Sequence, residues 1–592
     1  MTDTTINQDA AAIADRPWLD ASLPIDERVE LLLGEMTLEE KAGLFFHTMI
    51  AIGELDQPNP VFASPSAVDF VEQRLMTHFN LLGAAPRGGE IAAWQNAVQK
   101  LAASTRLGIP VTLSTDPRHS FSENPGAAIM AGPFSQWPET MGLAAIGDEA
   151  VVERFADIAR QEYTAVGLRV ALHPQVDLAS DPRWARGTAT FGEDADLSGR
   201  LGAAYIRGFQ GESFGVGSVS TMTKHFPGGG PQKDGEDPHF AYGREQVYPG
   251  GQFELHLKPF EAAFEAGTRQ IMPYYGMPVG TEYEEVGFGF NKSVITGLLR
   301  ERYGFDGVVC TDWGLINDAE IFGQAFPARA WGVEGLAPRD RMKKILDAGA
   351  DQFGGEACPE MLLDLVSTGE VTEDRLDVSA RRILREKFAL GLFENPYVDA
   401  DAANEIVGNA EFRAAGDAAQ RASITVITND GALPFARGVK LYVEGIAPEV
   451  AAEFGEVVDN PADADIAVLR LQAPFEVRET MFENFFHAGS LDFSEEVIAH
   501  VREIAAAVPT VVDVLLDRPA ILEPITDAAA AVTGNWGVSA AGLLDVLTGA
   551  AAPKGRLPFD LPRSMAAVEA SRPDVPFDTA DPLFRFGHGL SL

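Results

Sequence analysis

The stretch Gly-Phe-Asp-Gly-Val-Val-Cys-Thr-Asp-Trp-Gly, residues 304–314, decides the predicted fold. Residues 307–310 within it form a continuous apolar run, which is typical of a strand in a parallel sheet covered on both faces. The run is followed by a carboxylate, Asp312, and an indole, Trp313. Barrel enzymes place their catalytic groups at this end of a strand. An aspartate that caps the next helix is the alternative for an isolated example, so the rest of the chain must decide.

Similar apolar runs recur from about residue 26 to residue 396, and amphipathic helical stretches separate most of them, for example 92–103, 150–166 and 251–266. The candidate strands are 43–49, 79–83, 111–115, 170–174, 218–224, 270–274, 307–311 and 350–354. Eight strands alternating with helices predict a TIM-like (β/α)8 barrel, and the length fits such a barrel with insertions. The predicted fold class is therefore α/β.

A second α/β unit follows the barrel. Its candidate strands are 423–428, 440–444, 466–471, 510–516 and 530–533. Asn395-Pro396 ends the last helix of the barrel, because proline cannot continue a helix. The predicted organisation is an N-terminal extension (1–25), a TIM-like barrel catalytic domain (26–395), a linker (396–410) and an open α/β sandwich domain (411–592).

The composition excludes several classes of function. The 592 residues include 87 acidic and 46 basic side chains, a formal net charge of −41. This charge argues against nucleic acids and anionic membranes as partners, since both attract Lys and Arg. The chain has no run of about 18 apolar residues, and its polar N-terminus does not resemble a signal peptide. We therefore expect a cytoplasmic protein, or a periplasmic one if a leader has been removed.

The metal-binding residue types are not clustered in sequence. The two cysteines, Cys310 and Cys358, lack the spacing of a metal site, and no His, Asp and Glu cluster has it either. We therefore predict no cofactor and no catalytic metal, and leave open a structural cation in the acidic loops. The sequence does not distinguish a monomer from a homodimer.

Several predicted barrel strands end on polar residues of functional types. These residues are Asp116, Asp177, Lys224, His225, Tyr275 and Asp312. Packing explains the apolar runs, but not this choice of residues at so many strand ends. Lys224 and His225 can bind vicinal hydroxyls and keep a nearby carboxylate ionised. The glycines that follow, 228–230, fit no phosphate-binding loop.

Each of these residues also has a purely structural interpretation. Asp116 can accept two hydroxyl hydrogen bonds, or it can be a turn residue before Pro117. The guanidinium of Arg186, in the run Asp-Pro-Arg-Trp-Ala-Arg at 181–186, can bind sugar hydroxyls or a carboxylate. A surface ion-pair network is the alternative for such arginines in so acidic a chain.

Taken together, these segments resemble glycoside hydrolase family 3. Five segments occur in the family's order: Thr115-Asp116, residues 181–186 with Phe191-Gly192-Glu193-Asp194, Lys224-His225-Phe226, Met272-Pro273-Tyr274-Tyr275, and Thr311-Asp312-Trp313. Two segments of the second domain, 555–559 and 586–590, also fit. The resemblance extends from about residue 26 to residue 592, and the conjunction of the motifs in order is more specific than any one of them.

The resemblance implies a retaining, exo-acting β-glycosidase, in particular a β-glucosidase, whose substrate is a small oligosaccharide or an aryl or alkyl glycoside. Asp312 is implied as the nucleophile. The residues implied to hold the sugar are Asp116, Arg186, Lys224 and His225, with Tyr275 near the nucleophile and Trp313 as an aromatic wall. Retaining hydrolysis pairs the nucleophile with a protonated acid about 5–5.5 Å away.

The resemblance also implies that the second domain covers the mouth of the barrel and supplies the general acid/base. The matching segment is 471–491, in which Glu476, Glu479 and Glu483 compete for this role. We choose Glu476, because it lies two residues after Pro474, close to where many relatives place the acid. On this view the isolated barrel would bind sugar and turn it over poorly.

Two departures from the family pattern bear on the substrate. Ala189 stands near a place where a glutamate is common, which leaves subsite detail open. Gly229 stands where relatives that cleave N-acetylglucosamine usually carry a histidine, although Asp237 and His239 lie downstream. We therefore favour the β-glucosidase branch. The alternatives are a β-xylosidase or β-N-acetylglucosaminidase of the same family, or a carbohydrate-binding homologue without turnover.

Overall fold

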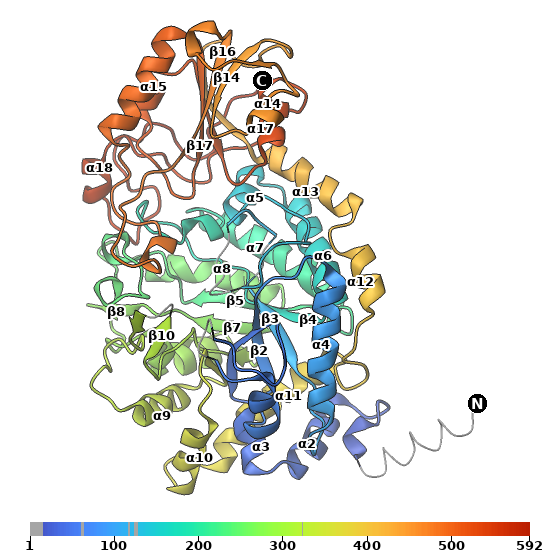
Figure 1. Ribbon diagram of the computed structural model, residues 1–592. Coiled ribbons are helices and arrows are strands. Elements are labelled where there is room, and N and C mark those ends of the chain that lie inside the picture. Colours follow the sequence, from blue (N-terminus) through green and yellow to red (C-terminus); the bar gives the residue numbers. More distant parts are fainter. Residues whose placement is uncertain (1–15, 61–63, 117–118, 123–127, 322–323) are drawn as a thin grey trace.

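The computed structural model describes residues 16–592, apart from 61–63, 117–118, 123–127 and 322–323 (Figure 1). Most of the predicted N-terminal extension and Pro117 therefore lie outside the described residues. The chain forms two lobes: a larger one, blue to yellow in Figure 1, and a smaller one above it, orange to red.

The larger lobe is built around an eight-stranded sheet in the order β12-β1-β2-β3-β4-β5-β7-β9. The strands are β1 (Phe46–Ala51), β2 (His78–Leu82), β3 (Thr112–Thr115), β4 (Leu168–Ala171), β5 (Ser220–Phe226), β7 (Gln270–Pro273), β9 (Val308–Val309) and β12 (Phe353–Gly354). All neighbouring pairs are parallel. A further parallel bridge, between Cys310 and Gln352, joins the two ends of the sheet into a ring. The predicted TIM-like barrel is therefore confirmed.

Helices surround this ring and cover the apolar outer faces of its strands. They include α2 (Ile25–Glu35), α3 (Leu38–Gly43), α4 (Gly88–Ala103), α5 (Thr140–Ile146), α6 (Glu149–Ala165), α7 (Ala195–Gln210), α8 (Phe253–Glu265), the π-helix Ser293–Arg302, α9 (Pro338–Ala348), α10 (Pro359–Ser367) and α11 (Glu373–Ala389). In α6, Phe155, Ala159 and Tyr163 recur at intervals of four and are all buried. This spacing gives the helix one apolar face, which packs inward.

The smaller lobe contains a six-stranded sheet in the order β13-β18-β17-β16-β14-β15. The strands are β13 (Thr425–Asn429), β14 (Lys440–Glu444), β15 (Glu456–Val457), β16 (Ile466–Gln472), β17 (Thr510–Leu515) and β18 (Ala531–Asn535). Only the pairing of β13 with β18 is antiparallel among the described strands of this sheet. The predicted α/β sandwich is confirmed. The two-residue strand β15 was not predicted, because so short a segment leaves no periodic pattern.

Helices lie on both sides of this second sheet. They are α13 (Ala410–Ser423), α14 (Pro448–Ala451), α15 (Glu495–Ala507), α16 (Glu523–Thr526), α17 (Ala540–Leu547) and α18 (Met565–Ala570). Figure 1 shows α15 on one side of the strands and α14 and α17 on the other. Among the helices that the structure describes, none is long and apolar enough to cross a membrane.

The segment predicted to link the domains contains a helix, α12 (Ala400–Ile406). It packs against the start of α4, where the backbone N–H of Gly89 donates to Asn404 Oδ1 at 2.9 Å. A side chain at Gly89 would collide with Ala400 and Asn404, so glycine allows this close approach. The connection between the lobes is therefore fastened to the barrel.

The motif Phe-Gly-Glu-Asp holds the two domains together. The buried carboxylate of Glu193 accepts hydrogen bonds from the backbone N–H groups of Asp560, at 2.6 Å, and Phe577, at 2.8 Å. A Cβ on Gly192, whose φ is +93°, would lie 2.2 Å from the carbonyl oxygen of Pro558. This motif therefore positions the second domain.

Candidate active site

A cavity of about 550 Å³ lies at the carboxyl ends of the barrel strands, where the second domain meets the barrel. The barrel residues that line it include Asp116, Arg186, Lys224, Tyr275, Asp312 and Trp313. Phe482, Phe485, Phe486, His487 and Asp517 line it from the second domain. The structure therefore brings together all the predicted barrel residues, since His225 lies directly behind this wall against Asp312.

Asp312 follows the short strand β9, and its carboxylate is held from one side only. Oδ1 accepts a hydrogen bond from the backbone N–H of Trp313 at 2.9 Å. Oδ2 is buried and has no hydrogen-bond partner among the described residues. A buried carboxylate oxygen without a partner is costly. Oδ2 is therefore the atom available to a substrate.

Tyr275 fixes the backbone that carries Asp312. Its hydroxyl accepts from the N–H of Trp313 and donates to the Trp313 carbonyl, both at 2.9 Å. Arg329 also donates to that carbonyl. Burial raises the pKa of the Tyr275 phenol well above its usual value, so it stays protonated and able to donate. Tyr275 thereby orients the Asp312 carboxylate through the intervening peptide.

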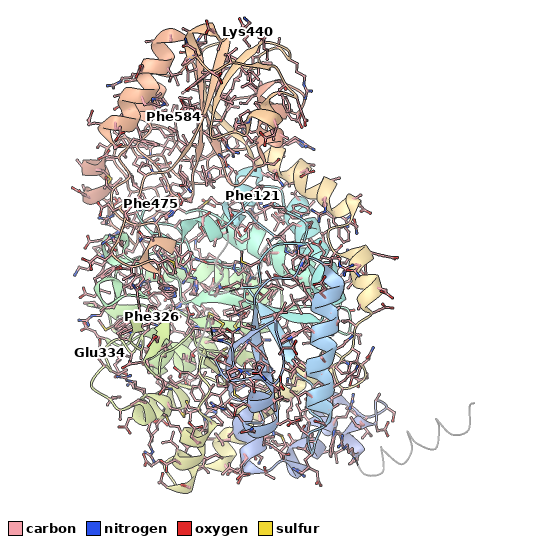
Figure 2. All side chains as sticks on the ribbon, in the orientation of Figure 1. Phe121, Phe326, Glu334, Lys440, Phe475 and Phe584 are labelled. Atoms are coloured by element: carbon pink, nitrogen blue, oxygen red, sulfur yellow. The ribbon has the colours of Figure 1, made fainter. Side chains whose placement is uncertain are left out.

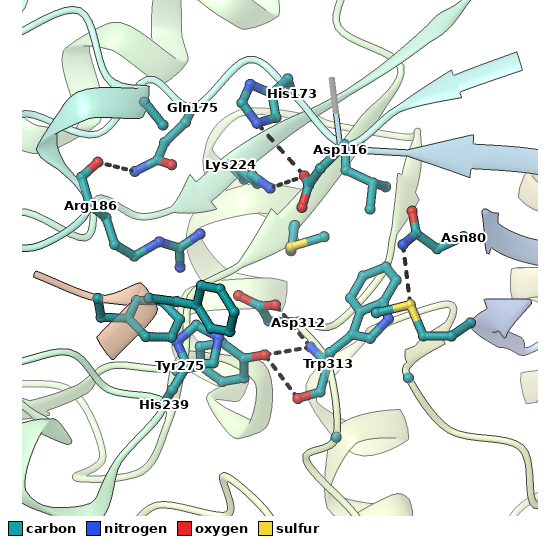
Figure 3. A pocket seen from close by; sticks show the side chains of 18 of the residues that line it. Asn80, Asp116, His173, Gln175, Arg186, Lys224, His239, Tyr275, Asp312 and Trp313 are labelled. Carbon is teal, nitrogen blue, oxygen red and sulfur yellow. Dashed lines mark hydrogen bonds and ion pairs between the residues drawn. The ribbon is translucent and has the colours of Figure 1, made fainter. Parts of the chain in front are cut away.

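Asp116 and Lys224 form a close ion pair in the cavity. Lys224 Nζ donates to Asp116 Oδ1 at 2.6 Å, and His173 Nε2 lies 3.7 Å from the same oxygen (Figure 3). Burial lowers the pKa of Lys224, while the Asp116 carboxylate opposes that shift. The pair provides an acceptor and a donor side by side, which suits two neighbouring hydroxyls.

His225 is locked in one orientation by Asp177. Its Nδ1 lies 2.7 Å from Asp177 Oδ2, and its Nε2 lies 3.8 Å from Asp312 Oδ2. Burial lowers the pKa of His225 well below its usual value and raises that of Asp177 to about 6. Asp177 also accepts from the N–H of Gly229, and a Cβ there would crowd Tyr274 and Asp177. Asp177 appeared in the sequence as a polar strand end without an assigned role.

Arg186 brings a positive charge to the cavity. Its guanidinium is buried, and Nη1 has no hydrogen-bond partner among the described residues. Although burial opposes it, the nearby anionic groups, including Asp237 and Asp312, raise the pKa of Arg186. In Figure 3 the guanidinium of Arg186 and the carboxylate of Asp312 point into the same space. Arg186 can therefore bind a hydroxyl and bring a positive charge close to the Asp312 carboxylate.

Trp313 provides an apolar wall beside Asp312. Its ring lies 5.4 Å from that of His47, and its Nε1 is buried without a hydrogen-bond partner among the described residues. We call Asp116, Arg186, Lys224, His225 and Asp312 the floor of the site. These five residues come from the ends of β3, β5 and β9 and from the loop after β4.

The structure places none of the three candidate glutamates in the cavity wall. Glu476 is exposed, and its carboxylate accepts from the N–H of Ser490 at 3.2 Å and lies 3.8 Å from Arg478. Glu483 accepts from Tyr242 and Thr480, and Glu479 is exposed. The role of Glu476 as acid/base therefore remains a prediction without a contact to the cavity.

Other residues of the same segment do reach the cavity. We call residues 474–490 the roof loop. It contributes Phe482, Phe485, Phe486 and His487, while Asp517 comes from the end of β17. The aromatic residues at 482–486 and the histidine after them lie inside the segment that the sequence predicted to cover the site. Their residue types could have indicated a cavity wall. Asp517 gave no signal beyond its place after a strand.

A histidine–aspartate pair also stands in the barrel half of the cavity. His239 Nδ1 lies 2.6 Å from Asp237 Oδ1, and the His239 ring is centred 4.6 Å from the rings of both Tyr275 and Phe486. Asp237 and His239 therefore lie beside Tyr275, which holds the backbone of Asp312, although the chain carries glycine rather than histidine at position 229. The ring of His239 therefore lies between Tyr275 of the barrel and Phe486 of the roof loop.

The fold and the site define a barrel glycoside hydrolase: a strand-end carboxylate with one unpaired oxygen faces a cavity that offers paired hydroxyl-binding groups. Comparisons with known proteins give the family. The description "Glycosyl hydrolase family 3 N terminal domain" matches residues 80–386, and "Glycosyl hydrolase family 3 C-terminal domain" matches residues 331–592. The chain belongs to glycosyl hydrolase family 3.

Similar proteins span almost the whole chain. "Probable beta-glucosidase C" of Aspergillus oryzae is 53% identical over 580 residues, covering 97% of this chain and 91% of that one. "Beta-glucosidase C" of Emericella nidulans is 52% identical over 579 residues, covering 97% and 93%. "Periplasmic beta-glucosidase/beta-xylosidase" of Dickeya chrysanthemi is 42% identical over 600 residues, covering 97% and 91%. The last name lends no support to the expected cytoplasmic location.

A solved structure shares the fold at low sequence identity. The β-glucosidase of Listeria innocua in complex with isofagomine superimposes with a TM-score of 0.75 at 22% identity, covering 95% of this chain and 83% of that one. Similarity at this identity bears on the fold alone.

Proposed function

We propose that the chain is a retaining, exo-acting β-glucosidase in which Asp312 is the nucleophile. The observation that carries the proposal is the unpaired, buried Oδ2 of Asp312, which faces the same cavity as the Asp116–Lys224 pair and Arg186. The names of the relatives from Aspergillus, Emericella and Dickeya support the choice of a β-glucosidase.

The floor residues have separate tasks in this reaction. Asp312 attacks the anomeric carbon and forms a glycosyl ester, and water then releases the sugar with its original configuration. Arg186 brings its positive charge close to Asp312, and His225 Nε2 lies 3.8 Å from Asp312 Oδ2. Asp116 and Lys224 bind neighbouring hydroxyls of the sugar. In an exo-acting enzyme these groups bind the terminal sugar of a chain.

The substrate in this proposal is a small oligosaccharide or an aryl or alkyl β-glucoside. A β-xyloside is the second candidate, because the Dickeya relative carries both activities in its name. The two sugars differ by the exocyclic hydroxymethyl group of glucose. The ratio of kcat/KM for the glucoside to kcat/KM for the xyloside therefore measures whether contacts with this hydroxymethyl group stabilise or destabilise the transition state.

The experiment compares 4-nitrophenyl β-D-glucoside, β-D-xyloside and N-acetyl-β-D-glucosaminide as substrates of the wild type and of Asp312→Asn. We expect the glucoside to be turned over fastest, β-glucose to appear first by NMR, and Asp312→Asn to lose turnover. A 2-deoxy-2-fluoroglucoside should label the peptide that contains Asp312. Label on another residue, or activity that survives Asp312→Asn, would overturn the assignment of Asp312 as the nucleophile. No turnover of any of the three glycosides would favour a carbohydrate-binding protein.

A further inference from the structure

The second domain presents a histidine–aspartate pair to the cavity. His487 Nδ1 contacts Asp517 Oδ2, and both residues line the cavity. His487 Nε2 and the buried Asp517 Oδ1 have no hydrogen-bond partner among the described residues. Because Nδ1 is engaged by the carboxylate, Nε2 is the nitrogen free to exchange a proton with a bound molecule.

The ring of His487 is fixed by its surroundings. Phe475, which lies where the second domain meets the barrel (Figure 2), stacks on it with a centroid distance of 3.8 Å and an interplanar angle of 5°. The buried guanidinium of Arg518, next in sequence to Asp517, donates to the carbonyls of Pro474, at 2.5 Å, and Gly489, at 3.2 Å. It also donates to the backbone carbonyl of Arg183, in the barrel, at 2.9 Å. The pair is therefore anchored to both domains.

Most other acidic groups of the cavity wall are occupied. Glu139 accepts from the N–H groups of Phe121 and Ser122, at 3.1 and 2.7 Å. Glu356 accepts from Ile316 and Asn317 at 2.6–3.1 Å. These hydrogen bonds tie both carboxylates to neighbouring backbone of the barrel, although burial raises the pKa of Glu356. Asp318 accepts from the N–H of Ala328 at 2.9 Å. Glu320, exposed on the hairpin strand β10 (Ala319–Ile321), is the carboxylate that remains to be tested.

The position of the pair suits a group that transfers a proton to the oxygen of the leaving group. The floor binds the sugar hydroxyls, so the aglycone must leave toward the second domain. The roof loop that carries His487 lines the cavity on that side. Three other histidines line the cavity. His119 is paired with Glu162 and His173 lies 3.7 Å from Asp116, while His239 packs between Tyr275 and Phe486 in the barrel half of the site.

We propose that His487 is the general acid/base of the reaction and that Asp517 is its positioning residue. The inference rests on the proposed function. In the first step Nε2–H of the imidazolium protonates the glycosidic oxygen as Asp312 forms its bond to the anomeric carbon. The bond to the leaving group breaks, and a neutral alcohol departs. In the second step neutral Nε2 takes a proton from water, the water oxygen bonds to the anomeric carbon, and the ester to Asp312 breaks.

The test uses the full chain and two glucosides. Cellobiose needs protonation of its leaving group, whereas 2,4-dinitrophenyl β-glucoside does not. We expect His487→Ala to lower kcat/KM for cellobiose by about 10²–10⁴-fold and to lower it far less for the aryl glucoside. Added azide should accelerate turnover of the aryl glucoside by His487→Ala and yield β-glucosyl azide, because azide needs no general base.

Matched variants separate the rival groups. Glu476→Gln, Glu320→Gln and His239→Gln should yield no glucosyl azide. Asp517→Asn should make kcat/KM depend more steeply on the pKa of the leaving group than in the wild type, which a purely structural role would not do. Circular dichroism monitors folding, and His487→Gln serves if the alanine variant fails to fold.

The outcomes are distinct. Glucosyl azide from a rival variant and none from either His487 variant would overturn the inference. The same holds if the His487 variants keep wild-type turnover of cellobiose. If the wild type hydrolyses no β-glycoside, the proposed function itself fails and the inference falls with it. If Asp312→Asn is inactive and the His487 variants behave as the wild type, only the present inference fails.

Discussion

The floor and the roof loop of the cavity are built by different physical means. The floor residues sit at or just beyond the ends of parallel strands, whose hydrogen-bonded register fixes their spacing, so that Lys224 and Asp116 meet at 2.6 Å across 108 positions of sequence. The roof loop has one short helical turn, Glu483–Phe485, and is held by side chains such as Arg518 and Phe475. Strand ends fix geometry through the backbone, whereas a loop depends on individual side chains.

The largest effect is expected from a substitution in the floor of the site. Asp312→Asn keeps the shape of the side chain and removes the nucleophilic charge, so kcat for 4-nitrophenyl β-D-glucoside should fall by more than about 10³-fold. Steady-state kinetics and a thermal unfolding curve together test this. An inactive variant with a much lower Tm would indicate misfolding rather than loss of the nucleophile.

The second prediction concerns how the floor holds the sugar. Asp116→Asn removes the negative charge opposite Lys224 and weakens a hydrogen bond to a sugar hydroxyl. A hydrogen bond to a charged group contributes about 1.5–3 kcal/mol. We expect kcat/KM for the glucoside to fall by about 10²-fold. The control is Glu411→Gln, an exposed carboxylate paired with Arg154 on the outer surface, which should leave kcat/KM unchanged.

The third prediction tests the roof loop. Arg518→Ala removes the donor to Pro474 and Gly489 and leaves buried carbonyls unsatisfied, so the free energy of unfolding should fall by about 2–3 kcal/mol. Activity toward cellobiose should suffer more than activity toward an activated aryl glucoside. In the control Arg437→Ala, at an exposed ion pair with Asp545, stability should change by less than about 0.5 kcal/mol. Equal losses in both variants would contradict the proposed role of Arg518.

The smallest effect concerns the contact between the domains. His256 donates from Nε2 to the carbonyl of Asp574 at 3.0 Å, its Nδ1 is buried without a hydrogen-bond partner among the described residues, and burial lowers its pKa to about 4. An unfolded histidine titrates near pH 6.5. Because folding keeps His256 neutral, the protein loses free energy of unfolding once an unfolded histidine would take up a proton. This loss is absent above pH 6.5 and grows as the pH falls toward 4.

Denaturant unfolding at several pH values measures this loss. Between pH 7 and pH 5.5 the contribution of His256 should decline by about 1 kcal/mol. His256→Gln, which cannot take up a proton, should flatten that part of the stability profile. An unchanged slope in the variant would assign the pH dependence to other groups.

The sequence predicted the barrel and its floor better than the roof loop, for a physical reason. The runs before Asp116, Lys224 and Asp312 contain no charged residue and are rich in Val and Thr, and this local pattern marks strands whose ends converge in a barrel. The position of the roof loop depends on contacts between residues such as Phe475 and His487 or Arg518 and Arg183, which no local pattern reveals. The glutamates of the roof loop were candidates for the acid/base because of their residue type, yet their carboxylates lie outside the cavity wall. Asp517 became visible only through its contact with His487.

The spread of the site along the chain has a consequence for biosynthesis. The cavity wall begins at Thr48 and ends at Asp517, and the bridge between Cys310 and Gln352 closes the barrel two residues before Asp312. The later backbone of Asp560 and Phe577 docks on Glu193, and Leu590 pairs with Val426. A nascent chain therefore cannot assemble the reactive centre until nearly its whole length has emerged from the ribosome. Products that terminate before Asp517 lack part of the cavity wall and should turn glycosides over poorly, so hydrolysis depends on both domains.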